Sequence, residues 1–409
     1  NSYDYEILVK TGFKQREYIN KPFRYNDFKI LAKKIIKYFG KNGYPYVTVS
    51  LDSIIIEDIE SKVSANLKIE AGPLIKIDSI IINKEAAVSS VFLNNYLNIK
   101  PGSLYNERKI NEIEKKLKEL KLITLTGHPL LLIRNNKANI YIKAEKKKVN
   151  VFSGIMGFMT DNTSSKFILT GDLNLRLYNT FKYGELLGVN WYKTNIYSQE
   201  IKTVVGIPYL FNTQIGVENK LNILKKDTTY FTVNERFGIK YFLNYLNYFN
   251  AYYENKVSKL INTNGLENVK VLPFYADIKS IYYGIELYKE LFDYRNNPLK
   301  GYSILLNFSL GVKQIIRNAK INQIVYDSIA LKSMQYRVIE ETSVFIPLGG
   351  RNTIGLFNKS AVITGNRLFT NELFRIGGLK TLRGFDEEIF YASKYSIFTL
   401  EYRYLFGEN

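Results

Sequence analysis

Residues 167–177 read Phe-Ile-Leu-Thr-Gly-Asp-Leu-Asn-Leu-Arg-Leu. Apolar side chains or glycine occupy every second position, and the positions between them include Asp172 and Arg176. A period of two is that of a β-strand, whose side chains point alternately to opposite faces of a sheet. Because residues 187–192 and 397–404 repeat the alternation, the pattern predicts a sheet with one apolar face and one strongly polar face.

Two architectures satisfy such a sheet. A soluble sandwich packs the apolar faces into a core, whereas a transmembrane barrel turns them toward lipid and turns its polar faces toward the lumen. Three features favour the barrel. The expected strands, about 10–16 residues long, exceed the usual five to six of globular sheets. Tyr and Phe gather near strand ends, where the aromatic girdles of barrels lie, and full charges occupy the lumen-side positions.

The alternation continues to the end of the chain and predicts about twelve antiparallel strands. Most turns between them are short, but the connections at 316–332 and 366–394 are long. In transmembrane barrels short turns face the periplasm and long loops face the outside. The expected strands are 149–160, 164–178, 183–195, 198–211, 213–226, 228–243, 246–260, 269–285, 301–315, 333–347, 352–364 and 395–406.

Before residue 147 helical and strand patterns alternate, which predicts a different kind of domain. Residues 25–42 carry apolar side chains at helical spacing, and strand-like runs follow at 45–57 and 61–70. A second unit has the order β-α-α-β-β. Its expected elements are 74–83, 88–97, 106–120, 122–133 and 137–145. We interpret the region as a tandem repeat of a small α+β domain, with boundaries at 1–72 and 73–147 and with the sheet in 148–409.

The composition excludes several kinds of chemistry. The chain has no Cys and a single His, so disulfides, thiolate metal sites and cysteine nucleophiles are impossible. The net charge is +19, from 57 Lys and Arg against 38 Asp and Glu. Such an excess is typical of proteins that bind nucleic acid or anionic surfaces. Lys here accompanies abundant Asn, Ile and Tyr along the whole chain, which also fits the codon bias of an AT-rich genome.

No arrangement of residues suggests catalysis. His128 lies in the turn-like Thr-Gly-His-Pro stretch, where a surface or bulge position is the natural interpretation. The carboxylates Glu340-Glu341 and Asp386-Glu387-Glu388 lack the spacing of a calcium loop and are interpreted as solvated charge. We therefore predict no catalytic residues, no metal and no cofactor, and a protein that is not an enzyme.

Within the long connection 366–394, residues 374–385 read Phe-Arg-Ile-Gly-Gly-Leu-Lys-Thr-Leu-Arg-Gly-Phe. This stretch resembles the conserved loop of the outer-membrane protein-assembly and two-partner-secretion superfamily (BamA, TamA and FhaC-like proteins, most like BamA). The core of that loop is a Val/Leu-Arg-Gly-Phe/Tyr sequence after a Gly pair. The matching residues are Gly377, Gly378, Leu382, Arg383, Gly384 and Phe385.

Other segments share the resemblance, which covers essentially the whole chain. The tandem units look like polypeptide-transport-associated (POTRA) domains, including Gly43-Tyr44-Pro45 and Glu70-Ala71-Gly72-Pro73. The end of an expected early strand, with Pro208 and Tyr209, is similar to the Pro-Tyr ending of an early barrel strand in the superfamily.

The resemblance implies that the motif loop folds back into the barrel lumen. A Gly pair lets the backbone turn tightly against a wall, and an Arg can fork to a carboxylate and fix the loop. Phe385 is expected to pack where the loop meets the wall. In the superfamily the acidic partner of the Arg lies on strands after the loop. By the alternation Glu401 points toward the lumen, so we expect Glu401 to pair with Arg383.

The fold that the resemblance implies is a set of α+β POTRA repeats followed by an all-β barrel of sixteen strands. Only one expected strand follows the motif loop, where the superfamily has four. We therefore expect the last four strands, and part of the N-terminal region, to lie outside this sequence. A smaller barrel of twelve strands is the alternative.

The function implied is assembly of outer-membrane β-barrel proteins in the bacterial outer membrane, with the POTRA domains in the periplasm. Unfolded outer-membrane proteins would pair with POTRA edge strands in 45–57 and 122–133, and then with the seam beside strand 149–160. Periplasmic chaperones, accessory assembly lipoproteins and lipid are the implied partners, and nucleic acid is not. The alternatives are a two-partner-type or TamA-like secretion pore, a passive porin or receptor-like barrel, and a soluble β-rich adhesin.

Overall fold

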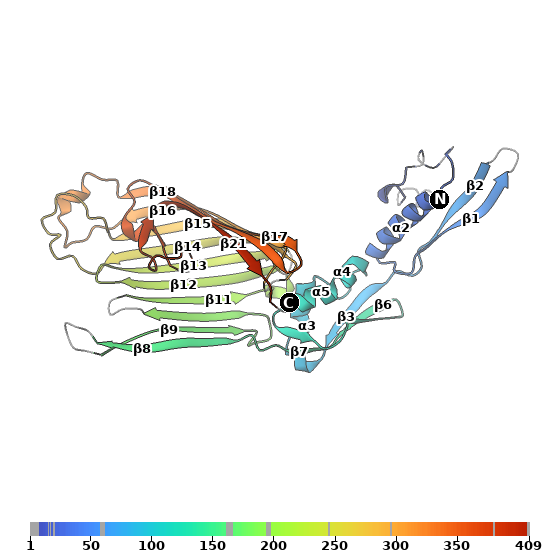
Figure 1. Cartoon of the computed structure of the whole chain (residues 1–409), viewed down its shortest axis with the longest axis horizontal. Coiled ribbons are helices and arrows are strands. Elements are labelled where there is room, and N and C mark those ends of the chain that lie inside the picture. The colour runs from blue at the N-terminus through green and yellow to red at the C-terminus, as the bar shows by residue number, and fades with distance from the viewer. Residues whose placement is uncertain are drawn as a thin grey trace. The chain divides into compact units, whose positions relative to one another are not determined.

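The computed structural model describes residues 8–14, 16, 18, 21–57, 62–160, 167–193, 198–243, 246–294, 297–378 and 381–406. The chain forms two compact units, Asn1–Lys147 and Lys148–Asn409 (Figure 1). The described helices are all too short or too polar to cross a membrane.

The first unit begins with a helix that packs on a hairpin. Helix α2 (Tyr25–Lys41) precedes β1 (Thr48–Glu57) and β2 (Lys62–Glu70), which pair antiparallel. Leu31, Ile35 and Phe39 form the buried stripe of the helix. They pack with partly buried residues at the base of the hairpin. The far half of the hairpin extends beyond this core.

The second half of that unit begins with a strand, continues with helices and ends with strands, as expected, but the expected helix 106–120 divides into two helices. Strand β3 runs parallel to β6, and β5 pairs antiparallel with the other edge of β6. Its elements are β3 (Lys76–Ile82), η2 (Lys84–Ala86), α3 (Ser90–Leu97), α4 (Glu107–Asn111), α5 (Ile113–Glu119), β4 (Ile123–Leu125), β5 (Leu130–Arg134), β6 (Lys137–Ile142) and β7 (Ala144–Lys146).

The prediction of one strand over 122–133 is wrong. The run divides into β4 and β5, which belong to different sheets because β4 pairs with β7 and β5 pairs with β6. The break contains Gly127 and Pro129. Proline has no backbone N–H to donate to a ladder, so a strand is interrupted there.

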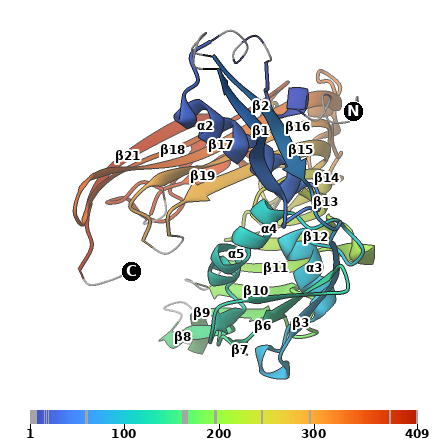
Figure 2. The same cartoon turned by 90° about the vertical axis from the view of Figure 1, so that its right-hand side faces the viewer.

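The second unit is one antiparallel sheet of twelve strands in chain order, as the alternation predicted (Figure 1). The sheet curves between its two edge strands, β8 and β21 (Figure 2). The strands are β8 (Val151–Thr160), β9 (Phe167–Tyr178), β10 (Leu186–Lys193), β11 (Gln199–Ile207), β12 (Ile215–Lys226), β13 (Tyr230–Phe242), β14 (Tyr248–Leu260), β15 (Ile278–Phe292), β16 (Gly301–Ile315), β17 (Lys332–Gly349), β18 (Asn352–Gly365) and β21 (Lys394–Tyr404).

One predicted strand is misplaced. The range 269–285 was expected to be a strand, but β15 begins at Ile278 and ends at Phe292. Residues 269–277 belong instead to a third long connection, between β14 and β15. Leu272 and Ala276 are buried there in an apolar cluster with the connections after β16 and β18. Their apolar side chains imitate a strand pattern, while Pro273 weakens strand pairing.

The sheet buries polar side chains on one face and exposes apolar side chains on the other, which is the reverse of a sheet in a soluble protein. On β16 the side chains of Asn307, Ser309 and Lys313 are at most 3% exposed, whereas the neighbouring Phe308 and Val312 are each 47% exposed. In a soluble sandwich the apolar face would be covered by a second layer. Among the described residues no such layer covers it. A buried polar face and an exposed apolar face are what a membrane-spanning barrel requires.

Candidate functional site

The candidate site is the motif loop, residues 366–393, together with the polar face of the sheet that it contacts. The first part of the loop is fixed to β16 and β17. Lys313, whose side chain is fully buried, donates to the carbonyl oxygens of Asn366 and Arg367 and pairs with Glu372 at 3.1 Å. Gln335 donates to the second oxygen of Glu372 at 2.7 Å. The buried charges are therefore paired and hydrogen-bonded, as burial demands.

The Gly pair expected to approach a wall instead approaches the returning arm of its own loop. Gly377 and Gly378 have φ angles of +129° and +88°, which favour glycine. A Cβ atom at Gly377 would overlap the carbonyl oxygen of Asp386, and one at Gly378 would overlap the carboxylate of Glu387. The hydroxyl of Thr381 accepts from the Gly377 N–H at 2.8 Å and donates to its carbonyl at 2.7 Å, so the turn is closed on itself.

Arg375 links the loop to a distant strand. It lies on β19 (Phe374–Ile376), which pairs with β20 (Phe390–Ala392) inside the loop. Its Nη1 is 2.6 Å from Glu388 of the same loop, and its Nη2 is 3.5 Å from Glu200 on β11. The side chains of Arg375 and Glu200 are 16% and 9% exposed.

Arg383 of the motif core contacts Glu401 on β21. The distance from Arg383 Nη2 to Glu401 Oε1 is 2.8 Å. The second oxygen of Glu401 accepts from Arg403 at 2.7 Å. The Arg383 side chain remains 67% exposed. In the described part of the chain the two residues paired by the sequence argument thus lie together, but at the rim of the loop and not in its buried part.

The aromatic residue expected at the wall does not lie there. Phe385 is 54% exposed, and its ring packs edge-on against Phe390 of the same loop, with the centroids 5.1 Å apart. The ring that meets the wall is that of Phe374, which packs against Tyr395 of β21 at 5.5 Å. Leu382 is partly buried, and Gly384 has a φ angle of +91° with open space around it.

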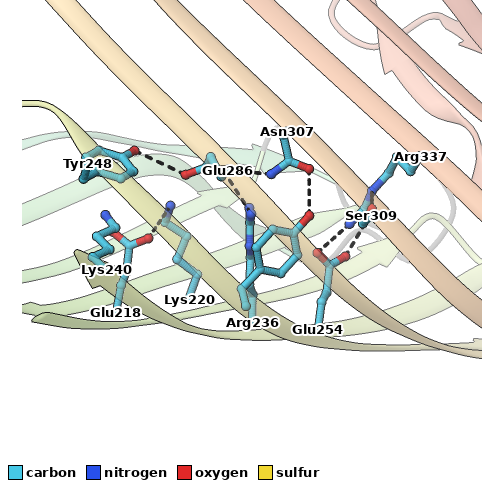
Figure 3. Close-up of polar contacts among 11 residues, drawn as sticks. Glu218, Lys220, Arg236, Lys240, Tyr248, Glu254, Glu286, Asn307, Ser309 and Arg337 are labelled. Carbon is cyan, nitrogen blue, oxygen red and sulfur yellow. Dashed lines mark hydrogen bonds and ion pairs between the residues drawn. The ribbon is translucent and has the colours of Figure 1, made fainter. Parts of the chain in front are cut away.

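Polar side chains interlock across the strands that face the loop (Figure 3). Arg236 pairs with Glu286 at 3.0 Å and stacks 3.4 Å above the ring of Tyr252. Asn307 donates to Glu286 at 2.9 Å and accepts from the Tyr252 hydroxyl at 2.7 Å. Four strands, β13 to β16, are thereby joined through one cluster of side chains.

A second cluster repeats this arrangement one step along the sheet. Arg337 forms a two-pronged ion pair with Glu254, at 2.9 Å and 2.7 Å, and lies over the ring of Tyr282 at 4.4 Å. The Tyr282 hydroxyl donates to Gln335 at 2.6 Å. Because Gln335 also donates to Glu372, this second cluster connects to the motif loop.

The strand-end residues Pro208 and Tyr209 shape the turn after β11. Tyr209 has a φ angle of +56°, is 8% exposed and packs against Phe242 of β13 at 5.1 Å. The short helix η3 (Leu210–Asn212) follows. The other short helices of this unit are η4 (Gln323–Tyr326) and η5 (Thr370–Glu372). Pro208 and Tyr209 thus fix the end of β11, the strand that carries Glu200.

The sequence reasoning missed Lys313, Glu372, Arg375 and Glu200. No local pattern shows which distant residue a lumen charge will meet. Taken together, these contacts fix the loop to three parts of the sheet, and no covalent chemistry is needed for that role.

No family model matches the sequence, and no curated protein matches it. Solved structures do match. CdiB from Escherichia coli aligns with a TM-score of 0.56 at 13% identity, over 100% of this chain and 74% of that chain. CdiB from Acinetobacter baumannii aligns with a TM-score of 0.55 at 14% identity, over 98% of this chain and 72% of that chain. This chain has the CdiB fold.

A BamA structure from Haemophilus ducreyi lacking POTRA domains 1–3 also matches, at 16% identity over 95% of this chain and 74% of that chain. Its TM-score of 0.48 carries no argument. The likeness to CdiB shows the fold alone, and that fold is the barrel architecture expected for the sheet. It agrees with the exposed apolar face of the sheet.

Proposed function

We propose that this protein is an outer-membrane barrel that assembles other β-barrel proteins by strand pairing. The observation that carries the proposal is the edge of an inside-out sheet. Strand β8 is paired on one side only, with β9, in the described chain. The side chains of Phe152 and Phe158, which lie on one face of β8, are 78% and 76% exposed.

Such an edge has a physical use in lipid. An unfolded chain entering a bilayer must satisfy every backbone N–H and C=O group, because the hydrocarbon core offers no water. A free strand edge supplies those partners in a row. A substrate strand added to β8 would gain backbone hydrogen bonds while its apolar side chains joined the exposed face. The site then works by templating and needs no catalytic residue, metal or cofactor.

The first unit would act before the membrane step. We propose that residues 1–72 and 73–147 are POTRA domains in the periplasm that receive unfolded outer-membrane proteins. Two of the edge strands there overlap the ranges expected to offer edges, 45–57 and 122–133. Strand β1 pairs only with β2, and β5 pairs only with β6, among the described strands. Leu130 and Leu132 on β5 are 58% and 47% exposed, so an added strand would find both backbone and apolar partners.

A secretion pore is the second candidate, and the CdiB fold favours it. CdiB is itself a two-partner-secretion barrel. In that role a polypeptide would cross the barrel lumen. The motif loop contacts the lumen side of β11, β16 and β17, so passage would require that loop to move.

The two functions predict different neighbours for the substrate, and disulfide trapping separates them. The chain has no cysteine, so an introduced one reacts without background. Ser153→Cys places a thiol on the β8 edge, and Asn219→Cys places one on β12, which is flanked by β11 and β13. Each variant is reconstituted in liposomes and mixed with a urea-unfolded outer-membrane barrel protein that carries one cysteine in its last strand.

Assembly by strand pairing predicts a disulfide from position 153 to the substrate and none from position 219. A disulfide needs Cα atoms about 4.4–6.8 Å apart, a spacing that neighbouring strands supply. Folding of the substrate, followed by its band shift on gels without heating, should accelerate over empty liposomes. If neither the disulfide nor the acceleration appears, while a secreted protein added outside becomes protected from protease inside, the assembly proposal is wrong and the pore is right.

A further inference from the structure

The motif loop touches the sheet at points that are far apart along it. Its end continues directly into β21, and Phe374 packs against Tyr395 of that strand. Another of its contacts, from Arg375, reaches Glu200 on β11. Along the sheet β11 and β21 are separated by β12 to β18. The loop therefore makes the short connection between two strands whose connection through the sheet is long.

Neighbouring residues other than the loop hold the Glu200 carboxylate in position. Its side chain is 9% exposed, and it accepts from Lys202 at 2.8 Å and from Asn222 of β12 at 2.9 Å. These partners fix the carboxylate without the loop. Removing Arg375 would thus leave Glu200 paired and the local strand structure in place, which makes the contact separable from the folding of β11.

Arg375 holds both carboxylates through different nitrogen atoms. Nη1 lies 2.6 Å from a carboxylate oxygen of Glu388, and Nη2 lies 3.5 Å from one of Glu200. A planar guanidinium offers donors in fixed directions, whereas the ammonium of Lys is a single point charge. The bridge between loop and wall therefore depends on arginine and not merely on a positive charge.

We propose that Arg375 is the positioning residue that makes the motif loop a strut of fixed length between β11 and β21. Strand β11 lies on the β8 side of the sheet, with only β9 and β10 between them. The strut therefore limits how far β11 and β21 can move apart. This inference concerns the barrel itself and goes beyond the proposed function, since an assembly factor and a secretion pore could both use it.

The test is a distance measurement between spin labels in detergent, without substrate. The labels are attached through Val205→Cys on β11 and Leu400→Cys on β21. In the native chain Val205 and Leu400 are 41% and 64% exposed, and both lie on the apolar face, away from the strut. The labelled parent should give one narrow distance distribution. Arg375→Gln should broaden it, and Glu200→Gln should broaden it equally. The double variant should add nothing further, because both changes remove the same contact.

Two further variants test the bridging geometry and specificity. Arg375→Lys should broaden the distribution as much as Arg375→Gln, because a single ammonium cannot hold both carboxylates. Arg317→Gln is the matched control, since its partner Asp327 lies in an exposed loop at 2.9 Å and the pair is 46% and 63% exposed. A distribution as narrow in Arg375→Gln as in the parent, or an equal broadening in Arg317→Gln, would overturn the proposal.

This readout does not depend on assembly activity. If the distributions behave as expected while no substrate disulfide forms at position 153, the strut stands and the proposed function falls. The reverse result removes the strut alone.

Discussion

The central wall of the sheet, β12 to β17, and its edge region, β8 to β10, are built differently. In the central wall, Tyr252 and Tyr282 lie across glycines of the next strand, where a Cβ at Gly284 or Gly311 would overlap the ring. Arginines stack on those rings and pair with buried carboxylates. In the edge region, the described contact between Asp172 and Asn190 is exposed.

The comparison shows which strands of the sheet are joined by buried side-chain contacts. On the apolar face the strands are joined by the backbone ladder and by ring contacts such as that between Tyr253 and Tyr283. The buried ion pairs Arg236–Glu286 and Arg337–Glu254 lie on the polar face, in the middle of the sheet. In the described part of the edge region, the side-chain contact between Asp172 and Asn190 is exposed. A sheet that must accept a new strand at β8 benefits from an edge that is free to adjust while the wall behind it stays fixed.

The largest expected effect comes from unpairing a buried charge in the central wall. Glu254→Gln leaves Arg337, whose side chain is 13% exposed, without its carboxylate. Breaking a buried pair in this way costs about 3–5 kcal/mol. We expect the free energy of unfolding in urea, followed by the gel band shift of unheated samples, to fall by that amount.

The matched change in the edge region is Asp172→Asn, at an exposed position on β9. An exposed polar contact is worth about 0–1 kcal/mol, so the urea midpoint should barely move. Equal losses for the two variants would remove the distinction between wall and edge.

A smaller effect on the free energy of unfolding is expected from adding a methyl group at a glycine that a tyrosine ring covers. Gly311→Ala forces the Tyr282 ring off the neighbouring strand and disturbs its contact with Arg337. Overpacking of this kind costs about 1–3 kcal/mol. The control is Gly157→Ala on β8, where a Cβ would meet only the Thr170 hydroxyl at 3.5 Å, an ordinary contact. The same unfolding assay should show no loss for the control. A loss at Gly157 as large as at Gly311 would show that the edge is packed as tightly as the wall.

How much of the fold and of the candidate site could be predicted from the sequence depends on how far apart in the chain the interacting residues lie. Alternation is local, so it predicted twelve strands and the polar side of Glu401. The long connections were harder, because buried loop residues such as Leu272 and Ala276 imitate a strand.

Contacts across the lumen had no local signal. Arg375 stands beside the recognised Gly pair, yet nothing near it in the sequence indicates Glu200. The expected wall contact of Phe385 failed for a related reason. The ring found a partner within its own loop, Phe390, and the wall contact passed to Phe374.

A third prediction isolates one hydrogen bond in the central wall. Tyr282→Phe keeps the ring under Arg337 but removes the hydroxyl that donates to Gln335. A buried hydrogen bond of this kind contributes about 0.5–1.5 kcal/mol. Tyr283→Phe is the control, because Tyr283 is 67% exposed on the apolar face. We expect a measurable fall in the urea midpoint for the first variant only, and a fall in both would mean that the loss is not specific to the wall.

The smallest expected effect on stability concerns the motif arginine itself. Arg383 is 67% exposed, and its partner Glu401 keeps a second arginine, Arg403, when Arg383 is replaced. Arg383→Gln should therefore cost about 0–1 kcal/mol in the urea assay. The loop also stays joined to β21 by the chain, so the label distance between positions 205 and 400 should keep its narrow distribution.

If Arg383→Gln leaves stability and distance unchanged but slows substrate folding in liposomes, the motif core acts on the substrate and not on the loop's position. Arg375→Gln should show the opposite pattern in the distance measurement. A clear loss of stability on replacing Arg383 would instead mean that the exposed pair at the rim holds the loop. The buried contact to β11 would then be secondary.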